Sequence, residues 1–556
     1  MSAVERVRAA YARMREVDRP EVWITVRDED DALAEAAEVD LGVAAGERLP
    51  LAGTVVAVKD NIDVEGMPTT AGSRAYAYRP ERDATAVARL RAAGAVVIGK
   101  TNLDQFATGL VGTRSPFGAV RNAWDPTRIS GGSSSGSAVA VALGVVDLAL
   151  GTDTAGSGRV PAALNGIVGV KPTVGLVPAT GVVPACRTLD CVTVFARDLS
   201  DARAAAELMA GPDGIDPLGR EDRPAPPLDA RPRVAIPTPD HLEGLADGWA
   251  EAFAGVVAAL AASGVEIVEV DIAPLLEAAS LLYGGAFVAE RTAAVGDFIA
   301  AHPELVGTDL DPTVAGIVLG GAEARAADYF RDRERLDRLG AEGLRRLDGT
   351  VALLTPTTTW HPTLDEVAAD PVGANSRMGR YTNFANLLDR SALAVPAGVV
   401  GGRAFGVMLT GAPFADRTLA QLAERIQAPS VDLLVVGAHL RGQPLNHQLV
   451  AAGGTFIAEV ETAAQYRLYA LDTVPPKPGL ARAAEGGAAI AGEVWRLPAA
   501  GFGRFVADLP APMGIGSAVL ADGSSVAGFL CEAVALEGAT DITAHGGWRA
   551  YRAATA

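Results

Sequence analysis

The sequence contains few cysteines, and those present are poorly placed for cross-linking or metal binding. Of 556 residues only three are cysteine, at Cys186, Cys191 and Cys531. Three thiols make no disulfide framework, and a Cys-x4-Cys pair without a nearby histidine is a poor zinc site. We therefore expect a reducing compartment, the cytoplasm, and neither a metal nor any other cofactor.

Long apolar runs are also missing. The longest candidate, at 138–150, has 13 residues and contains Asp147, whereas a helix that crosses a bilayer needs about 20 apolar residues. Residues 1–24 mix charged and apolar positions at helical spacing, without the continuous apolar core of a signal peptide. We expect neither a membrane anchor nor a secretion signal.

Positive charge is scarce, since 48 Lys and Arg stand against 67 Asp and Glu, a net charge of −19. Nucleic acids and anionic membranes attract clustered basic residues, so we expect neither as a partner and favour a small molecule. A hydrophobic content of 49% with 21% charged residues is typical of a globular chain, and its length predicts more than one domain.

Two clusters of serine and glycine, at 130–137 and 151–159, bracket the apolar run. A Gly/Ser segment is often a flexible linker. Here both clusters adjoin an apolar segment, which indicates glycines beside packed structure, where the backbone can approach closely. Uncovered N–H groups next to a serine hydroxyl can stabilise an oxyanion if a base deprotonates the serine.

The usual base, histidine, is absent from this region, because none of the six histidines precedes His241. The nearest alternative is Lys59, which ends the apolar run 55–58. Burial would lower the pKa of such a lysine below its free value of about 10.4. For Lys59 taken alone, a salt bridge with Asp60 or Asp63 is the other interpretation.

Taken together, these segments resemble the amidase signature family. VAVKDNID resembles its lysine motif, GGSSSGSA its first serine motif, and GTDTAGSGRVPA its nucleophile motif, in the family's order. Lys59 precedes Ser133 by 74 residues, and Ser133 precedes Ser157 by 24. The resemblance covers roughly residues 50–425.

The resemblance implies a catalytic role for each matched residue. Ser157 would be the nucleophile, Lys59 the general base, and Ser133 a bridging serine that follows a cis peptide bond. The oxyanion donors would be the backbone N–H groups of Thr154, Ala155, Gly156 and Ser157. Many members carry glycine where this chain has Ala155, and the added methyl group suggests a small substrate.

Strands and helices alternate along most of the chain, which predicts an α/β fold with buried inner strands. The resemblance implies three layers, α/β/α, with a mixed central sheet. The predicted strands are 54–58, 95–99, 145–149, 233–237, 265–270 and 351–354, and the predicted helices are 30–44, 84–93, 137–143 and 245–262.

Tyr283 and Arg291 lie eight residues apart in the apolar stretch 274–301. On one helix they would share a face, about two turns apart; a half-buried tyrosine and a surface arginine are the plainer interpretation. Within the amidase signature family, this stretch and the polar segment 379–386 look closest to allophanate hydrolases, which use such a pair to hold the substrate carboxylate. The planar guanidinium suits that role.

A second domain follows a break at 426–430. We expect an amidase domain over 1–428 and a small α+β domain over 431–556, with short strands at 454–459, 465–471, 492–497, 516–520 and 526–533. This part resembles the C-terminal domain of allophanate hydrolases, whose fold is similar to gamma-glutamyl cyclotransferases. Amidases of other specificity usually lack it.

The resemblance implies hydrolysis of allophanate to ammonia and N-carboxycarbamate, which then decarboxylates, with the C-terminal domain assisting. His439, at the end of a buried run, is the catalytic candidate there, although a structural histidine fits the same position. The alternatives are an amidase with another substrate, a glutamine amidotransferase subunit, or a C-terminal domain that serves assembly. A homodimer is expected, which could join a larger complex with upstream enzymes.

Overall fold

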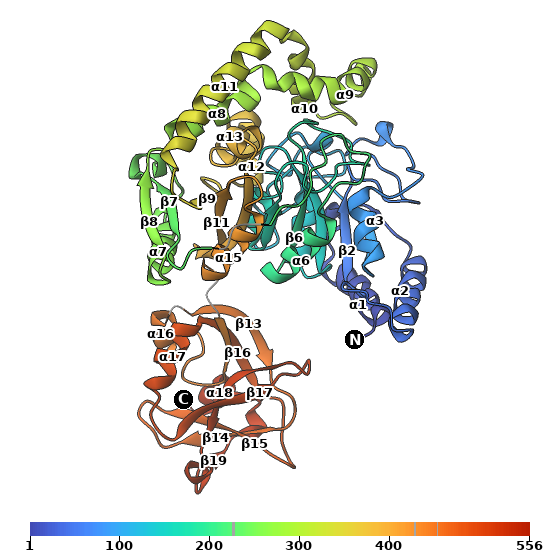
Figure 1. The fold of residues 1–556 in the computed structure, drawn as a ribbon. Coiled ribbons are helices and arrows are strands. Elements are labelled where there is room, and N and C mark those ends of the chain that lie inside the picture. The colour runs from blue at the N-terminus through green and yellow to red at the C-terminus, as the bar shows by residue number, and fades with distance from the viewer. Residues whose placement is uncertain (225–227, 427–429, 453, 556) are drawn as a thin grey trace. The chain divides into compact units, whose positions relative to one another are not determined.

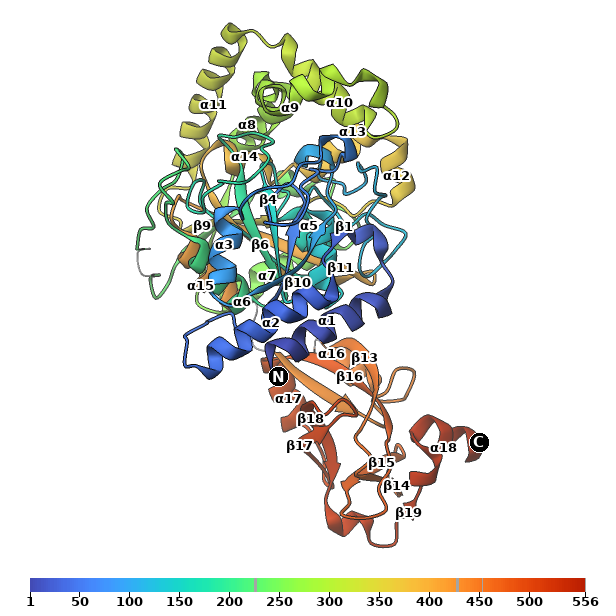
Figure 2. The same ribbon diagram turned by 90° about the vertical axis from the view of Figure 1, so that its right-hand side faces the viewer.

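The computed structural model describes residues 1–224, 228–426, 430–452 and 454–555. The chain divides into two units, Met1–Ile426 and Gln427–Ala556, whose helices and strands are drawn in Figures 1 and 2. Each unit contains hydrophobic clusters made of its own residues.

Within the described part of the first unit, eleven strands form one mixed sheet in the order β1-β3-β2-β4-β6-β5-β10-β11-β9-β7-β8. Its centre combines parallel pairs, such as β2 with β4, and antiparallel pairs, such as β4 with β6. The expected α/β fold with a mixed sheet is therefore confirmed. The strands are β1 (Trp23–Val26), β2 (Val55–Lys59), β3 (Val96–Thr101), β4 (Leu148–Asp153), β5 (Val168–Lys171), β6 (Cys191–Ala196), β7 (Arg233–Pro237), β8 (Glu266–Val270), β9 (Ala352–Pro356), β10 (Ser391–Val400) and β11 (Arg403–Gly411).

Helices cover both faces of this sheet. In β2, Val56 and Val58 belong to one hydrophobic cluster, and Val55 and Ala57 to another, because successive side chains of a strand point to opposite faces. The first cluster includes residues of α3 (Thr85–Ala92), α6 (Leu199–Met209), α7 (Trp249–Ala262) and α15 (Asp416–Ile426). The second includes residues of α1 (Ala3–Val17), α2 (Glu29–Ala44) and α4 (Ser135–Ala142).

The apolar run between the two serine clusters divides differently from our prediction. The helix begins earlier than predicted, at Ser135, and ends near Gly144, which has a φ of +70°. The strand predicted at 145–149 is wrong in its bounds, since β4 covers Leu148–Asp153. Residues 151–153 of the second serine and glycine cluster thus lie in the sheet. Residues 154–159 follow directly at the carboxyl end of β4.

The stretch 274–301 is not one helix. It forms α8 (Ala273–Gly284) and α9 (Ala289–Ala301), which a short 3-10 turn separates. Figure 1 shows them grouped with α10 (Pro312–Gly320) and α11 (Ala326–Arg346). Among the described residues, no helix is both long enough and apolar enough to span a membrane.

In the described part of the first unit, three more short helices follow β9. Another short helix follows the loop 154–159, which we name the nucleophile loop after the predicted role of Ser157. The three are α12 (Leu364–Ala369), α13 (Pro371–Met378) and α14 (Asn383–Leu387), and the helix after the loop is α5 (Val160–Asn165). The predicted polar segment 379–386 therefore includes the start of α14.

The described part of the second unit contains a five-stranded sheet in the order β13-β16-β12-β18-β17 and a three-stranded sheet in the order β15-β14-β19. Our prediction missed two strands, β15 and β19, and three helices, α16, α17 and α18. Proline and glycine interrupt β15, and two glycines interrupt α17. The elements are β12 (Ser430–Val435), α16 (Asn446–Ala451), β13 (Thr455–Glu461), β14 (Tyr466–Leu471), β15 (Lys477–Arg482), β16 (Ala491–Pro498), α17 (Ala499–Ala507), β17 (Met513–Val519), β18 (Ser525–Cys531), β19 (Thr540–Asp541) and α18 (Trp548–Thr555).

Candidate active site

Lys59 ends strand β2 with its side chain fully buried. Its Nζ lies 2.7 Å from Ser133 Oγ and 2.7 Å from Thr152 Oγ1. The alternative interpretation, a salt bridge with a neighbouring carboxylate, does not describe this lysine. Asp60 instead pairs with Lys100 at 3.0 Å, and Asp63 accepts hydrogen bonds from Thr69 and Tyr78.

Burial changes the acid-base behaviour of Lys59. Removal from water disfavours the charged form and lowers the pKa from 10.5 to about 7. The negative charges of Asp104, Asp190 and Asp153 oppose this shift only in part. An ordinary lysine is neutral in roughly one molecule in 3,000 at pH 7, whereas Lys59 can act as a base near neutrality.

The loop before α4 holds Ser133 against Lys59. The Gly132–Ser133 peptide bond is cis, and the Ser133 carbonyl accepts the N–H of Asp104. A Cβ atom added at Gly132 would lie 2.1 Å from Asp104 Oδ2, so only glycine fits there. The Asp104 carboxylate also accepts the N–H groups of Val111 and Gly112. Asp104 therefore links the backbone at Ser133 to the segment 111–112.

The nucleophile loop wraps around the carboxylate of Asp153, at the end of β4. This carboxylate accepts the N–H groups of Gly156 and Gly158, each at 2.9 Å, and pairs with Arg159 at 2.8 Å. Gly156 has a φ of +130°, and a Cβ atom there would lie 2.4 Å from Thr382 Oγ1. The glycine is therefore required by both backbone conformation and space.

The four N–H groups expected to serve the oxyanion differ in their partners. The N–H of Gly156 already donates to Asp153. Within the described residues, those of Thr154, Ala155 and Ser157 donate to no protein acceptor outside regular secondary structure. The Thr154 hydroxyl donates to Asp190. Ser157 itself is 1% exposed, and its hydroxyl is 3.4 Å from the Gly109 carbonyl, a weak contact that leaves it free to turn toward a substrate.

Residues of the segment 379–386 hold this loop from the other side. Thr382 Oγ1 donates to the Ala155 carbonyl at 2.6 Å, and Asn386 Nδ2 donates to the Asp153 carbonyl at 2.8 Å. Both side chains are buried. Thr382 and Asn386 therefore act as packed polar side chains that support the loop.

Arg291 and Tyr283 meet although they lie on separate helices. Arg291 Nη2 is 3.1 Å from the Tyr283 hydroxyl, and the guanidinium lies 4.7 Å from the tyrosine ring centre. Arg291 is 1% exposed, so the plainer interpretation of a surface arginine is wrong. Its Nη1 contacts Cys186 Sγ, and burial raises the pKa of that thiol to about 12. Among the described residues, Arg291 Nε is buried without a hydrogen-bond partner.

Tyr283 also lines a cavity of about 300 Å³, together with Arg114 and Asn375. Asn375 accepts the N–H of Leu110 at 2.7 Å, and Leu110 follows Gly109, whose carbonyl contacts Ser157. The cavity is thus joined to the nucleophile loop by one short segment of chain.

Sequence reasoning missed two residues that organise this site. Thr152 binds Lys59, and Asp190 accepts hydrogen bonds from Thr154 and from the N–H of Cys186. Thr152 stood inside the nucleophile motif and could have been suspected. Asp190 lies outside the quoted motifs, and only the antiparallel pairing of β4 with β6 brings it near.

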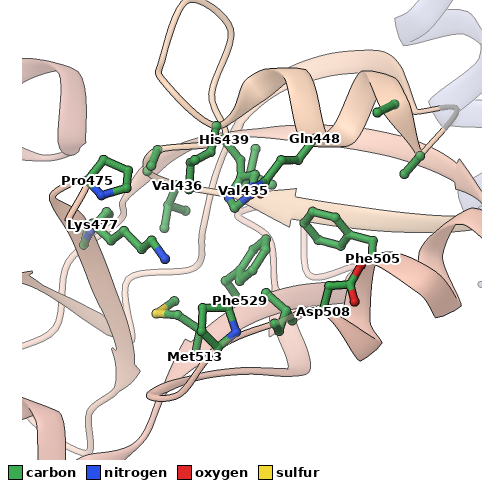
Figure 3. Close-up of a pocket in the computed structure, with 18 of the residues that line it drawn as sticks. Val435, Val436, His439, Gln448, Pro475, Lys477, Phe505, Asp508, Met513 and Phe529 are labelled. Carbon is green, nitrogen blue, oxygen red and sulfur yellow. Dashed lines mark hydrogen bonds between the residues drawn. The ribbon is translucent and has the colours of Figure 1, made fainter. Parts of the chain in front are cut away.

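His439 lies in the second unit, beside a cavity of about 510 Å³ (Figure 3). Its ring stacks on Phe529 with centres 5.0 Å apart, and Nε2 lies 3.0 Å from Gln448 Oε1. Burial lowers the pKa of His439. The imidazole is therefore neutral at pH 7 and borders open space.

Comparisons with known proteins agree with the division of the chain into the units Met1–Ile426 and Gln427–Ala556. An amidase family model matches residues 5–420, and a model of the allophanate hydrolase C-terminal domain matches residues 431–553. A urea amidolyase of Lachancea kluyveri is 44% identical over 95% of this chain and 31% of its own length. The chain thus spans about a third of that relative.

A solved structure of Kluyveromyces lactis allophanate hydrolase is 41% identical, with a TM-score of 0.72 over 100% of this chain and 97% of that one. A glutamyl-tRNA(Gln) amidotransferase subunit of Symbiobacterium thermophilum is 37% identical over 76% of this chain and 92% of its own length. The match to the amidotransferase subunit thus leaves about a quarter of this chain uncovered.

We predict that Lys59 loses its proton near pH 7. The chain has only four lysines, so the protein labelled with [13Cε]lysine should give four signals, with Lys59 assigned from a Lys59→Met variant. The Lys59 signal should titrate with a midpoint near pH 7, because burial penalises its ammonium form. A midpoint close to the ordinary 10.5 would contradict the assignment of a neutral base.

Proposed function

The chain belongs to the amidase family, and from that premise we propose that it is an allophanate hydrolase. The observation that carries the reaction class is the 2.7 Å contact between buried Lys59 and Ser133 beside the loop that bears Ser157. The observation that favours the substrate is the buried Arg291 and Tyr283 pair, together with the similarity of both units to allophanate hydrolases.

Hydrolysis would begin with attack of Ser157 Oγ on the terminal amide carbonyl of allophanate. Ser133 takes the proton of Ser157 and passes its own to neutral Lys59, so the three groups act as one relay. The developing oxyanion accepts hydrogen bonds from the N–H groups of Ala155 and Ser157, with Thr154 adjoining. Gly156 shapes the loop instead, since its N–H remains on Asp153.

The relay then runs in reverse. The proton on Lys59 returns through Ser133 to the leaving nitrogen, the C–N bond breaks, and ammonia departs from an acyl-enzyme on Ser157. Water, deprotonated by the same relay, attacks the acyl carbon and releases N-carboxycarbamate. The proton taken from Ser157 on attack leaves with ammonia, and the proton taken from water passes through the relay to Ser157 Oγ as the acyl C–O bond breaks. Ser133 and Lys59 therefore end each half of the cycle unchanged.

The substrate carboxylate would bind Arg291. The guanidinium already holds Tyr283 and Cys186 but keeps Nε without a partner, and an unpaired buried donor is costly until a ligand satisfies it. A carboxylate can accept two N–H groups from such a fork. The methyl group of Ala155 limits the room beside the nucleophile and fits a small substrate.

The second unit would assist the decarboxylation, with His439 as the catalytic candidate. In that step N-carboxycarbamate takes a proton on nitrogen, one C–N bond breaks with its electron pair left on nitrogen, and carbon dioxide leaves. The remaining carbamate takes a second proton and separates into ammonia and carbon dioxide. Two observations support this role. His439 lines a cavity of about 510 Å³, and the residues around it match the model of the allophanate hydrolase C-terminal domain.

The strongest alternative is an amidase of another amide or a glutamine amidotransferase subunit. Similarity to the amidotransferase relative leaves about a quarter of this chain unmatched, which weighs against that assignment. A panel of allophanate, biuret, glutamine, acetamide and benzamide with ammonia detection would decide. A clear preference for any neutral amide would overturn the substrate assignment. Assembly remains the alternative role for the second unit.

We place the enzyme in the cytoplasm as a homodimer, able to work beside the enzyme that makes its substrate. The urea amidolyase relatives are about three times as long as this chain, which covers 31% of the first. The additional length of these relatives supports the proposal that this chain works together with other enzymes.

We predict that the three relay residues fail together. Ser157→Ala should abolish ammonia release from allophanate, and Ser133→Ala or Lys59→Ala should each lower kcat on the order of 10³-fold or more. The Lys59→Ala/Ser133→Ala double variant should be little slower than either single one. Ser135→Ala, which removes a hydroxyl bound to the Asn102 carbonyl, is the matched control. Near-normal kcat in Lys59→Ala would refute the relay.

We predict that Arg291 acts on the carboxylate. Arg291→Ala should raise KM for allophanate roughly 10- to 150-fold, the loss expected for a charge-assisted pair, and should spare acetamide. Arg291→Lys, which keeps the charge without the fork, should recover only part of the loss. Equal damage to both substrates would make Arg291 structural.

We predict that His439→Leu slows the second step alone. Carbon-13 NMR of labelled allophanate should show N-carboxycarbamate persisting longer than with the parent protein, while the first ammonia is released at the normal rate. His447→Leu is the control, because His447 is exposed and its one hydrogen bond among the described residues is with the Pro444 carbonyl. An unchanged intermediate lifetime in His439→Leu would leave His439 a structural role.

A further inference from the structure

The large cavity of the second unit combines an apolar wall with charged groups. Val435 and Val436, at the end of β12, and Phe505, Met513 and Phe529 form the apolar part. The polar lining consists of His439, Gln448, Lys477, Arg504 and Asp508. In Figure 3 the side chain of Lys477 extends toward Phe529, across the cavity from Asp508.

The charge of this lining is opposite to that of the protein. The chain carries −19 overall, yet two basic side chains and one acidic side chain line the cavity. Among the described residues, neither Lys477 nor Arg504 forms a salt bridge. The positive charge of Lys477 also contributes to the lowered pKa of His439, which places both groups in one electrostatic environment.

The choice of lysine at position 477 is unusual in this chain. Lysine occupies four positions, and the 44 other basic residues counted with it are arginine, since lysine and arginine total 48. The other three lysines are all buried in the first unit. Lys59 binds Ser133, Lys100 pairs with Asp60, and Lys171 donates to the Pro172 carbonyl. Each of these three has a defined local partner, whereas Lys477 borders open space.

We propose that Lys477 is the anion anchor of this cavity, where its ammonium group holds one carboxylate of a small dicarboxylate. This inference rests on the proposed function, because the dicarboxylate that the first step would supply is N-carboxycarbamate. The compact ammonium of lysine suits a point contact with one carboxylate oxygen, whereas the broad fork of arginine suits a flat, bidentate one.

The apolar and the charged parts of the lining would affect the two carboxylates of the ligand differently. One carboxylate pairs with Lys477, whose positive charge compensates its negative charge. The other lies against Phe529 and the valines, where an ion loses its hydration without compensation. The negative charge of this second carboxylate is therefore destabilised. It is the carboxylate that leaves as neutral carbon dioxide. His439 lines the same cavity, and its Nε2 lies 3.0 Å from Gln448 Oε1.

Malonate is the test ligand, because it has a methylene group where N-carboxycarbamate has N–H. The full chain carrying Ser157→Ala and [13Cε]lysine is titrated with malonate, with the Lys477 signal assigned from Lys477→Arg. The Lys477 signal should move and saturate with malonate and stay still with neutral malonamide. An unmoved Lys477 signal, or an equal response to malonamide, would overturn the proposal.

Variants then separate this site from the amidase site, where Lys59 provides a second signal in the same spectrum. Asp508→Asn removes the one acidic side chain of the lining and should tighten malonate binding at Lys477. In Lys477→Met, which lacks the lysine signal, malonate binding is followed by the imidazole signal of His439 on the same cavity, assigned from His439→Leu. Binding should weaken roughly ten-fold or more, and binding unaffected by this change would also refute the proposal.

Turnover distinguishes failure of this inference from failure of the proposed function. With labelled allophanate, Lys477→Met should lengthen the lifetime of N-carboxycarbamate relative to the rate of first ammonia release. A parent-like lifetime in Lys477→Met would count against the anchor while the amidase assignment stands. If the parent protein released no ammonia from allophanate, the proposed function would fail, and the malonate titration would still decide whether the cavity binds dicarboxylates.

Discussion

The burial of one ammonium group is the constraint on which the site depends. Lys59 is fully buried, and its two closest polar partners are the hydroxyls of Ser133 and Thr152. Hydroxyls can accept from the ammonium or donate to the amine, so they satisfy either protonation state. A carboxylate in the same place would hold the proton on Lys59, and Asp60 is kept away from it by its pair with Lys100.

Three carboxylates near Lys59 favour its ammonium form, and none of them accepts a hydrogen bond from it among the described residues. Asp153 is one of them, and its carboxylate is saturated by Arg159 and by the N–H groups of Gly156 and Gly158. Arg159 in turn reaches Thr382 and Asn386. The loop is therefore set by a buried ion pair with satisfied hydrogen bonds, the one condition under which such a pair is tolerated in a core.

Much of the fold could be read from the sequence, because alternating apolar strands and helices produce strong periodic patterns. The strand after Gly144 was misplaced because a continuous apolar run gives no boundary between helix and strand. The spacing of Tyr283 and Arg291 predicted one face of a single helix, whereas the two side chains meet across a break between two helices. Asp190 could not be found, since its role depends on strand pairing between distant segments, and β15 and α17 were hidden by proline and glycine.

Lys59 and Arg291 show how equal burial can produce opposite chemistry. Each is at most 1% exposed, and burial penalises the charged form of both. Lysine escapes that penalty by losing its proton, and it becomes a base. Arginine cannot lose its proton in a protein, so Arg291 must be stabilised by Tyr283, Cys186 and, in the proposed function, the substrate carboxylate. Exchange of the two residue types would give a site without a base and an anchor without a permanent charge.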